Sequence, residues 1–130
     1  MALLKKVFRL VKKKPIKVAF FTNGPNTPTG YAKVLRELLL RFKNDSDFEI
    51  MIFNELQFSS EKGEWMGIPM YGLTVPIVAS GTGLAPVREK SAEGVYKLVQ
   101  EHKPDVLWLL EDSFTLRNLG FENLFQFPVK

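Results

Sequence analysis

The chain has 130 residues, of which 45% are hydrophobic and 25% are charged, a composition typical of one globular domain that buries its own core. It contains no cysteine, which excludes disulfides and thiolate chemistry and fits a reducing compartment. Its net charge is +4, no apolar run approaches the roughly 18 residues of a membrane span, and the first residues lack the pattern of a signal peptide.

Basic charge is concentrated at the start of the chain. Six of the 18 basic residues lie within the first 14 positions, where there is no acidic residue, and the rest of the chain carries 12 basic against 14 acidic residues. A nucleic-acid surface needs basic residues interleaved with aromatic ones along the fold, and the mildly acidic remainder lacks that pattern. We therefore expect no nucleic acid among the partners.

Residues 1–14 form a leader that precedes the domain predicted for residues 15–130. Within residues 2–13 the apolar and basic side chains occupy opposite helical faces, which predicts a short amphipathic helix that Pro15 ends. One interpretation is a cytoplasmic protein held peripherally at the inner face of an anionic membrane; the other is that the apolar face packs on its own domain or on a partner. The apolar positions are Leu3, Leu4, Val7, Phe8 and Val11, and the predicted membrane contacts are Lys5, Lys6, Phe8, Arg9, Lys12 and Lys13.

Residues 16–31 predict a strand, a loop and the start of a helix. The segment 16–21 is rich in β-branched and aromatic residues, the next residues are Thr, Asn, Gly and Pro, and apolar residues recur at helical spacing from Gly30 to Phe42. In a parallel sheet this loop lies at the carboxyl edge. There the free N–H groups of the helix start can bind an anionic or hydroxyl-rich ligand.

Strands and helices continue to alternate along the rest of the chain. A helical connection makes the second strand parallel to the first, Pro69 marks the third strand as an edge, and the apolar run at 105–110 is typical of a central parallel strand. Ser80 to Gly83 is a weak candidate for a phosphate loop and is better interpreted as part of a mobile loop. The predicted elements are strands at 48–53, 65–71, 105–110 and 125–129, helices at 88–102 and 113–119, and loops at 55–63 and 73–86.

This order predicts a single α/β domain with a doubly wound, mainly parallel sheet, a Rossmann-like three-layer α/β/α architecture. In such a sheet the strands at 16–21 and 105–110 are neighbours where the strand order reverses, and ligands bind in the crevice at that point. Two loops then face each other, and they supply backbone donors, hydroxyls and two carboxylates. The predicted substrate-binding residues are Asn23, Gly24, Thr29, Gly30, Tyr31, Glu111 and Asp112.

Two of these residues carry specific expectations. The glycine at position 30, like Gly24, would let the backbone approach a ligand closely. Asp112 can cap the following short helix, accept hydrogen bonds from a ligand, or do both.

Other site chemistries find little support in the sequence. The single histidine, His102, ends a predicted helix, where interaction with the helix dipole is its expected role. Without a second histidine or any cysteine we expect no metal site, and no elbow motif surrounds a serine at a strand end. We also expect no bound cofactor.

Several motifs in order resemble the amino-terminal half of family 4-like (GT-B) glycosyltransferases. They are Pro28-Thr29-Gly30-Tyr31 before a helix, Trp65 to Tyr71 (WMGIPMY), and Lys103 to Trp108 (KPDVLW) before Asp112, and together they cover about residues 16–130. The resemblance implies the acceptor-binding domain of a retaining, metal-independent transferase whose nucleotide-sugar donor binds to a second domain. It implies a sugar or lipid-linked acceptor near the loop at Gly30, with Asp112 as an acceptor contact. It assigns no catalytic base.

Two alternatives stay open. Residues 22–27 (TNGPNT) loosely resemble the phosphate loop of a flavodoxin-like mononucleotide binder, although Pro25 and Pro28 lack the amides that such a loop uses. The third hypothesis is a non-catalytic interaction domain with the same fold. Activity as an enzyme is expected only when a carboxyl-terminal donor domain is joined to the chain.

Overall fold

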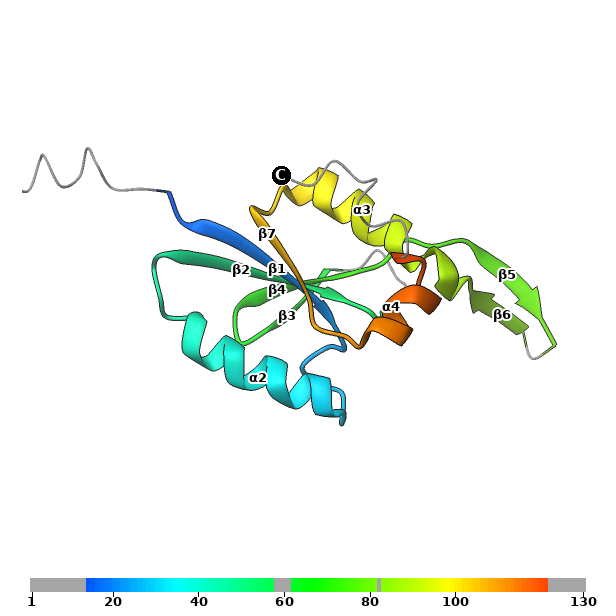
Figure 1. Ribbon diagram of the computed structural model, residues 1–130, viewed down its shortest axis with the longest axis horizontal. Coiled ribbons are helices and arrows are strands. Elements are labelled where there is room, and N and C mark those ends of the chain that lie inside the picture. The colour runs from blue at the N-terminus through cyan, green and yellow to red at the C-terminus, as the bar shows by residue number, and fades with distance from the viewer. Residues whose placement is uncertain (1–13, 58–61, 82, 122–130) are drawn as a thin grey trace, which may run out of the picture.

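A mixed, mostly parallel five-stranded sheet forms the centre of the α/β fold (Figure 1). The computed structural model describes residues 14–57, 62–81 and 83–121. Residues 1–13 of the leader, which include all of its predicted membrane contacts, and the strand predicted at 125–129 lie outside these residues. The sheet has the order β3-β4-β2-β1-β7, and its strands are β1 (Ile16–Thr22), β2 (Phe48–Asn54), β3 (Lys62–Trp65), β4 (Ile68–Gly72) and β7 (Val106–Leu109).

The first strand lies between β2 and β7, as the sequence predicts, and both pairings are parallel. β2 also pairs in parallel with β4, and β3 is the one antiparallel strand of the described sheet. The carboxyl ends of β1, β2 and β7 therefore meet at one edge of the sheet. The polar residues that follow these three strands are brought together there.

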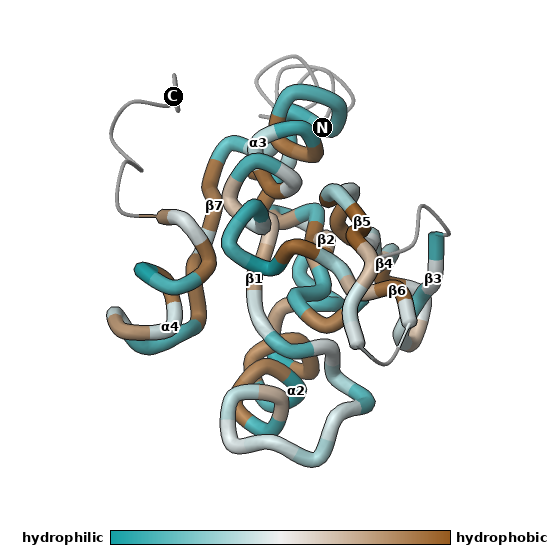
Figure 2. Tube along the Cα trace, turned by 90° about the vertical axis from the view of Figure 1, so that its right-hand side faces the viewer, coloured by the Kyte–Doolittle hydropathy of each residue, from teal (hydrophilic) through white to brown (hydrophobic). Residues whose placement is uncertain are grey.

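Helices α2 (Gly30–Phe42) and α3 (Ser91–His102) lie on opposite sides of the sheet in both views (Figures 1 and 2). The side chain of Thr29 caps α2 by accepting from the N–H of Ala32. At the other helix Lys103 has a left-handed backbone, with φ of 51°, and Pro104 follows it. A 3₁₀ turn, η1 (Arg88–Lys90), leads into α3, and a third helix, α4 (Ser113–Asn118), follows β7.

The core has two parts because successive residues of each strand point to opposite faces. On β1, Val18 and Phe20 pack on the side of α2, whereas Ala19 and Phe21 pack on the side of α3. The α2 side is completed by Leu35, Leu39, Ile50, Ile52, Ile68 and Met70, and the α3 side by Met51, Phe53, Leu73, Val75, Ala92, Val95, Leu98, Leu119 and Phe121.

The segment predicted as one edge strand at 65–71 is a hairpin of β3 and β4. Met66 and Gly67 form its turn, both with positive φ (50° and 83°), so the sequence prediction of a single strand was wrong. β4 has a neighbour on each side, and β3 is the edge strand on this side of the described sheet. Pro69 is accommodated because the pairing of β4 with β2 begins only at Met70, after the residue that lacks an N–H.

Two further predictions are corrected. Part of the segment predicted as a mobile loop at 73–86 belongs to an antiparallel hairpin of β5 (Ile77–Ser80) and β6 (Gly83–Pro86), and Ser80 and Gly83 of the weak phosphate-loop motif lie in these strands. This hairpin extends from the body of the domain (Figure 1). β7, predicted to be central, is an edge strand of the described sheet, and Val106 and Trp108 on it are over 40% exposed.

Within the residues that the structure describes, none of the helices has the length and apolar character needed to cross a bilayer.

Candidate functional site

The strand register places Asn23, Glu55 and Glu111 side by side at the carboxyl edge. Phe21 pairs with Phe53 on β2 and with Leu109 on β7, so the residues two positions further on, which lie on the same face, are Asn23, Glu55 and Glu111. The ladder continues to this point, because the N–H of Glu55 donates to the carbonyl of Thr22 and that of Leu110 to the carbonyl of Phe21. The three polar side chains therefore stand on regular, paired backbone.

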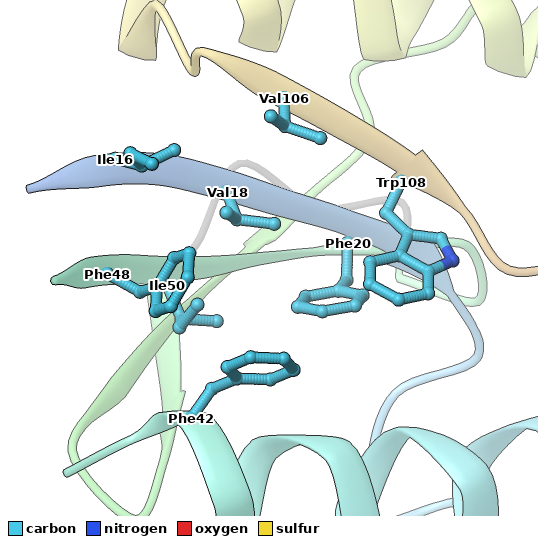
Figure 3. Close-up of a pocket in the computed structure, with 8 residues that line it drawn as sticks. All are labelled: Ile16, Val18, Phe20, Phe42, Phe48, Ile50, Val106 and Trp108. Atoms are coloured by element: carbon cyan, nitrogen blue, oxygen red, sulfur yellow. The ribbon is translucent and has the colours of Figure 1, made fainter. Parts of the chain in front are cut away.

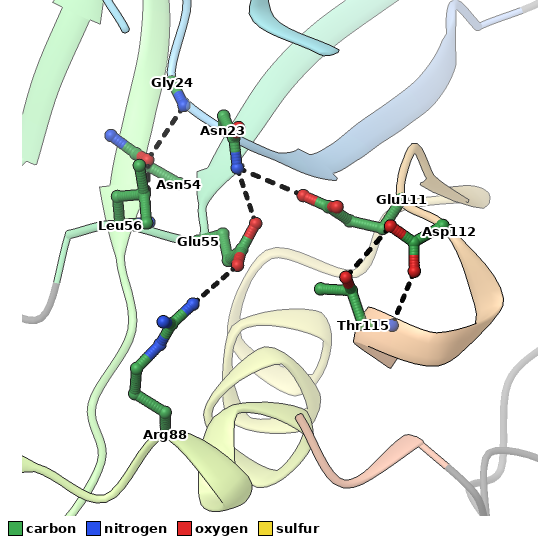
Figure 4. Close-up of polar contacts among 9 residues, drawn as sticks. All are labelled: Asn23, Gly24, Asn54, Glu55, Leu56, Arg88, Glu111, Asp112 and Thr115. Carbon is green, nitrogen blue, oxygen red and sulfur yellow. Dashed lines mark hydrogen bonds and ion pairs between the residues drawn. The ribbon is translucent and has the colours of Figure 1, made fainter. Parts of the chain in front are cut away.

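A continuous set of hydrogen bonds joins these three side chains to Arg88 (Figure 4). The amide Nδ2 of Asn23 donates to Oε2 of Glu55 at 2.6 Å and to Oε1 of Glu111 at 3.1 Å. Arg88, on the turn before α3, donates from Nη2 to the other oxygen of Glu55 at 2.8 Å. We call Asn23, Glu55, Arg88 and Glu111 the carboxyl-edge cluster.

Glu55 is the buried charge of this cluster, since only 3% of the residue is exposed. A carboxylate at such a depth needs a counter-ion and hydrogen-bond donors, and Arg88 and Asn23 supply them. The Arg88 side chain is itself half exposed, so it reaches from solvent into the site. Its contact with Glu55 uses one nitrogen of a guanidinium that carries five N–H donors.

Glu111 is a strongly perturbed carboxyl group. Burial, followed by a hydrogen bond and charge repulsion from Glu55, raises its pKa to about 9, and the Asp112 carboxylate adds to the effect while Arg88 opposes it. Glu111 is thus protonated near neutral pH. The guanidinium of Arg88 pairs with the buried carboxyl group of Glu55, so the cluster combines hydrogen-bond donors and acceptors.

The cluster lines a polar cavity of about 440 Å³. Tyr31 of α2 lines it on one side, and α4 supplies Thr115 and Asn118. The complete lining is Asn23, Tyr31, Glu55, Arg88, Glu89, Glu111, Thr115, Asn118 and Leu119. Three of the residues predicted from the sequence, Asn23, Tyr31 and Glu111, therefore meet at one cavity.

Asp112 caps α4 and also contacts the loop after β1. Its Oδ1 accepts from the N–H of Thr115 at 2.7 Å and its Oδ2 from the Thr115 hydroxyl at 3.0 Å, contacts that lower its pKa. The hydroxyl of Tyr31 donates to Oδ2 at 3.3 Å. Partial desolvation and then the Asp112 carboxylate raise the pKa of Tyr31. The capping expectation for Asp112 is therefore confirmed.

The other predicted residues of the first loop have backbone roles. The N–H of Gly24 donates to Oδ1 of Asn54 at 3.0 Å, and a Cβ at this position would lie 2.5 Å from the Asn54 amide nitrogen. Thr29 caps α2. By contrast, Gly30 has open space around its Cα. Only Gly30 of the two glycines leaves room for a ligand to approach.

The loop is also fastened from the following helix. Nη1 of Arg36 donates to the carbonyls of Pro25 and Thr27, at 2.8 and 3.3 Å. The N–H of Thr27 donates to the carbonyl of Gly24, so two loop amides, those of Gly24 and Thr27, are used internally. A loop that binds a phosphate through its backbone would leave such groups free.

Sequence reasoning missed Glu55 and Arg88. The segment that begins at Glu55 was predicted to be a polar loop, yet the position continues the alternation of Met51 and Phe53 on the α3 face. That alternation was a usable signal. For Arg88 there was none, because its position depends on where the η1 turn packs.

His102 has a neighbour that was not predicted. Its ring stacks on Tyr71, with ring centroids 4.0 Å apart, at the end of α3 opposite to the cavity. In the described part of the chain, no three His, Cys, Asp or Glu side chains gather as metal ligands would.

Comparison of the chain with family models, with curated proteins and with solved structures gives no significant match.

Proposed function

We propose that this domain binds a hydroxyl-rich acceptor, a sugar or a lipid-linked sugar, in the carboxyl-edge cavity. In this proposal it is the acceptor-binding, amino-terminal domain of a retaining glycosyltransferase of the GT-B type. One observation carries the proposal: side chains from the ends of β1, β2 and β7 form a single hydrogen-bonded cluster on the wall of a polar cavity.

The strand order supports this assignment. The sequence β4-β2-β1-β7 has the first strand inside the sheet, with the chain moving outward on one side and then returning to the other. A doubly wound, Rossmann-like sheet has this order around its ligand crevice. The cavity lies at that position.

The chemistry of the cavity favours a neutral polyol over a strongly charged ligand. Protonated Glu111 donates, and Arg88 is already paired with Glu55, while Tyr31 adds an aromatic residue that could pack on the C–H groups of a sugar ring. Glu89 also lines the cavity, and its carboxyl group disfavours an anionic ligand. A mononucleotide would instead need free loop amides, and Gly24 and Thr27 use theirs internally. The nucleotide-sugar donor would bind to a second domain, and the chain by itself would be inactive.

Under this proposal the protein works in the cytoplasm, and the lysines of the leader attract it to an anionic membrane surface. The absence of cysteine fits that compartment.

The test is a titration of the full chain, labelled with ¹⁵N, with a panel of neutral disaccharides. Binding should shift the side-chain amide of Asn23 and the backbone amide of Thr115, and leave the β5–β6 hairpin unchanged. The Thr115→Val variant should bind more weakly, because it removes a hydroxyl from the cavity wall, whereas Thr74→Val outside the cavity should bind normally. Shifts confined to other surfaces, or none with any disaccharide, would remove the proposal.

A further inference from the structure

A second cavity, an apolar groove, lies on the opposite face of the sheet, between the strands and the last turn of α2 (Figure 3). It has a volume of about 240 Å³, and every residue that lines it is apolar. Phe42 comes from α2 and the others from three strands. The groove is lined by Ile16, Val18, Phe20, Phe42, Phe48, Ile50, Val106 and Trp108.

This face of β1 and β7 is incompletely covered by the described residues. Ile16, Val106 and Trp108 are 45%, 44% and 41% exposed, although a parallel strand is normally covered on both faces. Trp108 rests on Phe20, with ring centroids 5.1 Å apart and one side of the indole toward the groove. On the other face of the same strands, Ala19 and Phe21 are completely buried. Among the residues that the structure describes, no element therefore covers this part of the α2 side.

The leader has the dimensions and the chemistry for this position. The groove begins at Ile16, and only Lys14 and Pro15 separate residues 1–13 from that position. As a helix, the twelve residues 2–13 would rise about 18 Å. The wall of the groove from Ile16 to Phe20 extends about 13 Å. A leader that reversed its direction at Pro15 would therefore reach along the whole groove.

The two faces of the predicted leader helix also match the apolar groove on one side and the solvent on the other. Leu3, Leu4, Val7, Phe8 and Val11 share one helical face, and the basic residues lie on the other. We propose that the groove binds the apolar face of residues 2–13 of the same chain, with the basic face toward solvent. This inference does not depend on the glycosyltransferase proposal.

Tryptophan fluorescence tests the proposal. The chain has two tryptophans, so Trp65→Phe leaves Trp108 as the only one. In this background Val7→Asp/Phe8→Asp should release the leader, shift the emission of Trp108 to longer wavelength and increase its quenching by acrylamide. The control Lys6→Ser/Arg9→Ser changes the net charge by the same amount on the basic face and should leave the emission unchanged. Equal emission and quenching in the parent and the Val7→Asp/Phe8→Asp variant would overturn the proposal.

Engineered cysteines identify the occupant, because the natural chain has none. The pair Val11→Cys/Val106→Cys should form a disulfide within one chain. Lys13→Cys/Val106→Cys, closer in sequence but on the basic face, should form it much more slowly. If the disulfides form only between two chains and not within one, the groove binds a second copy. If the emission of Trp108 shifts only when anionic phosphatidylserine vesicles are added, the groove binds lipid. Either result overturns the proposal.

Discussion

Glu55 and Glu111 extend from β2 and β7, the two neighbours of β1, and both accept a hydrogen bond from the amide of Asn23. Two carboxyl groups that face one donor cannot both ionise at low cost. One proton is therefore retained in the pair near neutral pH. Burial and the neighbouring Glu55 favour the protonated form of Glu111, while Arg88 forms its ion pair with Glu55.

The first prediction concerns the stability of the folded chain between pH 5 and 9. The folded pKa of Glu111, about 9, lies above its ordinary value of 4.5, so the folded state holds more protons than the unfolded state over this range. Stability is greatest below pH 4.5 with respect to this group and falls as the pH rises toward 9. The free energy of unfolding should fall by at most about 1.4 kcal/mol per pH unit. Because Glu111 is only partly buried, solvent screening should make the pH interval of this decline narrower.

Urea denaturation at several pH values tests this slope. Glu111→Gln cannot ionise and should flatten the decline, whereas Glu37→Gln on the exposed face of α2 should keep it. Parallel pH profiles for the wild type and Glu111→Gln would contradict the assignment.

A second prediction concerns the shared amide. Asn23→Asp replaces a donor with a third carboxylate in a nearly buried position, and we expect a loss of about 2–4 kcal/mol at neutral pH. Lowering the pH should recover part of the loss, because protonation restores a donor. Asn26→Asp, exposed on the same loop, makes the same chemical change and should cost little. Similar losses in the two variants, measured by chemical denaturation, would mean that Asn23 is not the centre of the cluster.

The two glycines of the first loop should respond in opposite ways to alanine. Gly24→Ala would push a methyl group against Asn54 and break the bond from the Gly24 N–H, for a loss of about 1–3 kcal/mol. Gly30→Ala has open space at the start of α2 and should be neutral or stabilising by up to about 1 kcal/mol. Thermal unfolding of both variants measures this. If Gly30→Ala also abolishes disaccharide binding, the ligand approaches the helix start closely.

A fourth prediction concerns the contact between Tyr31 and Asp112. Removing the Asp112 charge in Asp112→Asn should lower the pKa of Tyr31 toward its ordinary value of 10, since that carboxylate is one cause of the upward shift. Tyrosinate absorbance gives the titration, and the difference from a Tyr31→Phe variant isolates this residue from Tyr71 and Tyr96. Asp105→Asn, at the other end of the sheet, should leave the curve unchanged. An unchanged curve in Asp112→Asn would place Tyr31 away from the carboxylate.

The sequence predicted the parallel centre of the sheet well, because its signals are local. Apolar runs at β1 and β2 and helical spacing in α2 and α3 identify these elements without knowledge of their neighbours. The β3–β4 hairpin was missed because its turn is formed by Met66, a residue type that rarely has positive φ. The β5–β6 hairpin was missed because glycine and proline in that segment are equally typical of a loop.

The candidate site was predictable only where strand ends are visible in the sequence. Asn23 and Glu111 lie just after the ends of β1 and β7, and Tyr31 lies at the start of the helix that follows the first loop. Glu55 was missed because the polar residues after Asn54 look like an ordinary loop, although the alternation of Met51 and Phe53 continues to it. Arg88 is 33 residues from its partner Glu55, a pairing that only tertiary structure specifies.

Because its residues are so far apart in sequence, the cluster forms only when the three strands have assembled. It joins positions 32, 33 and 88 residues apart, so no piece of the chain shorter than the span from Asn23 to Glu111 can assemble it. A ligand that contacts all of these side chains would bind only to the folded chain, in which β1, β2 and β7 lie side by side. Binding would then stabilise the folded state by RT ln(1 + L/Kd) at ligand concentration L, so the melting temperature should rise with the ligand concentration.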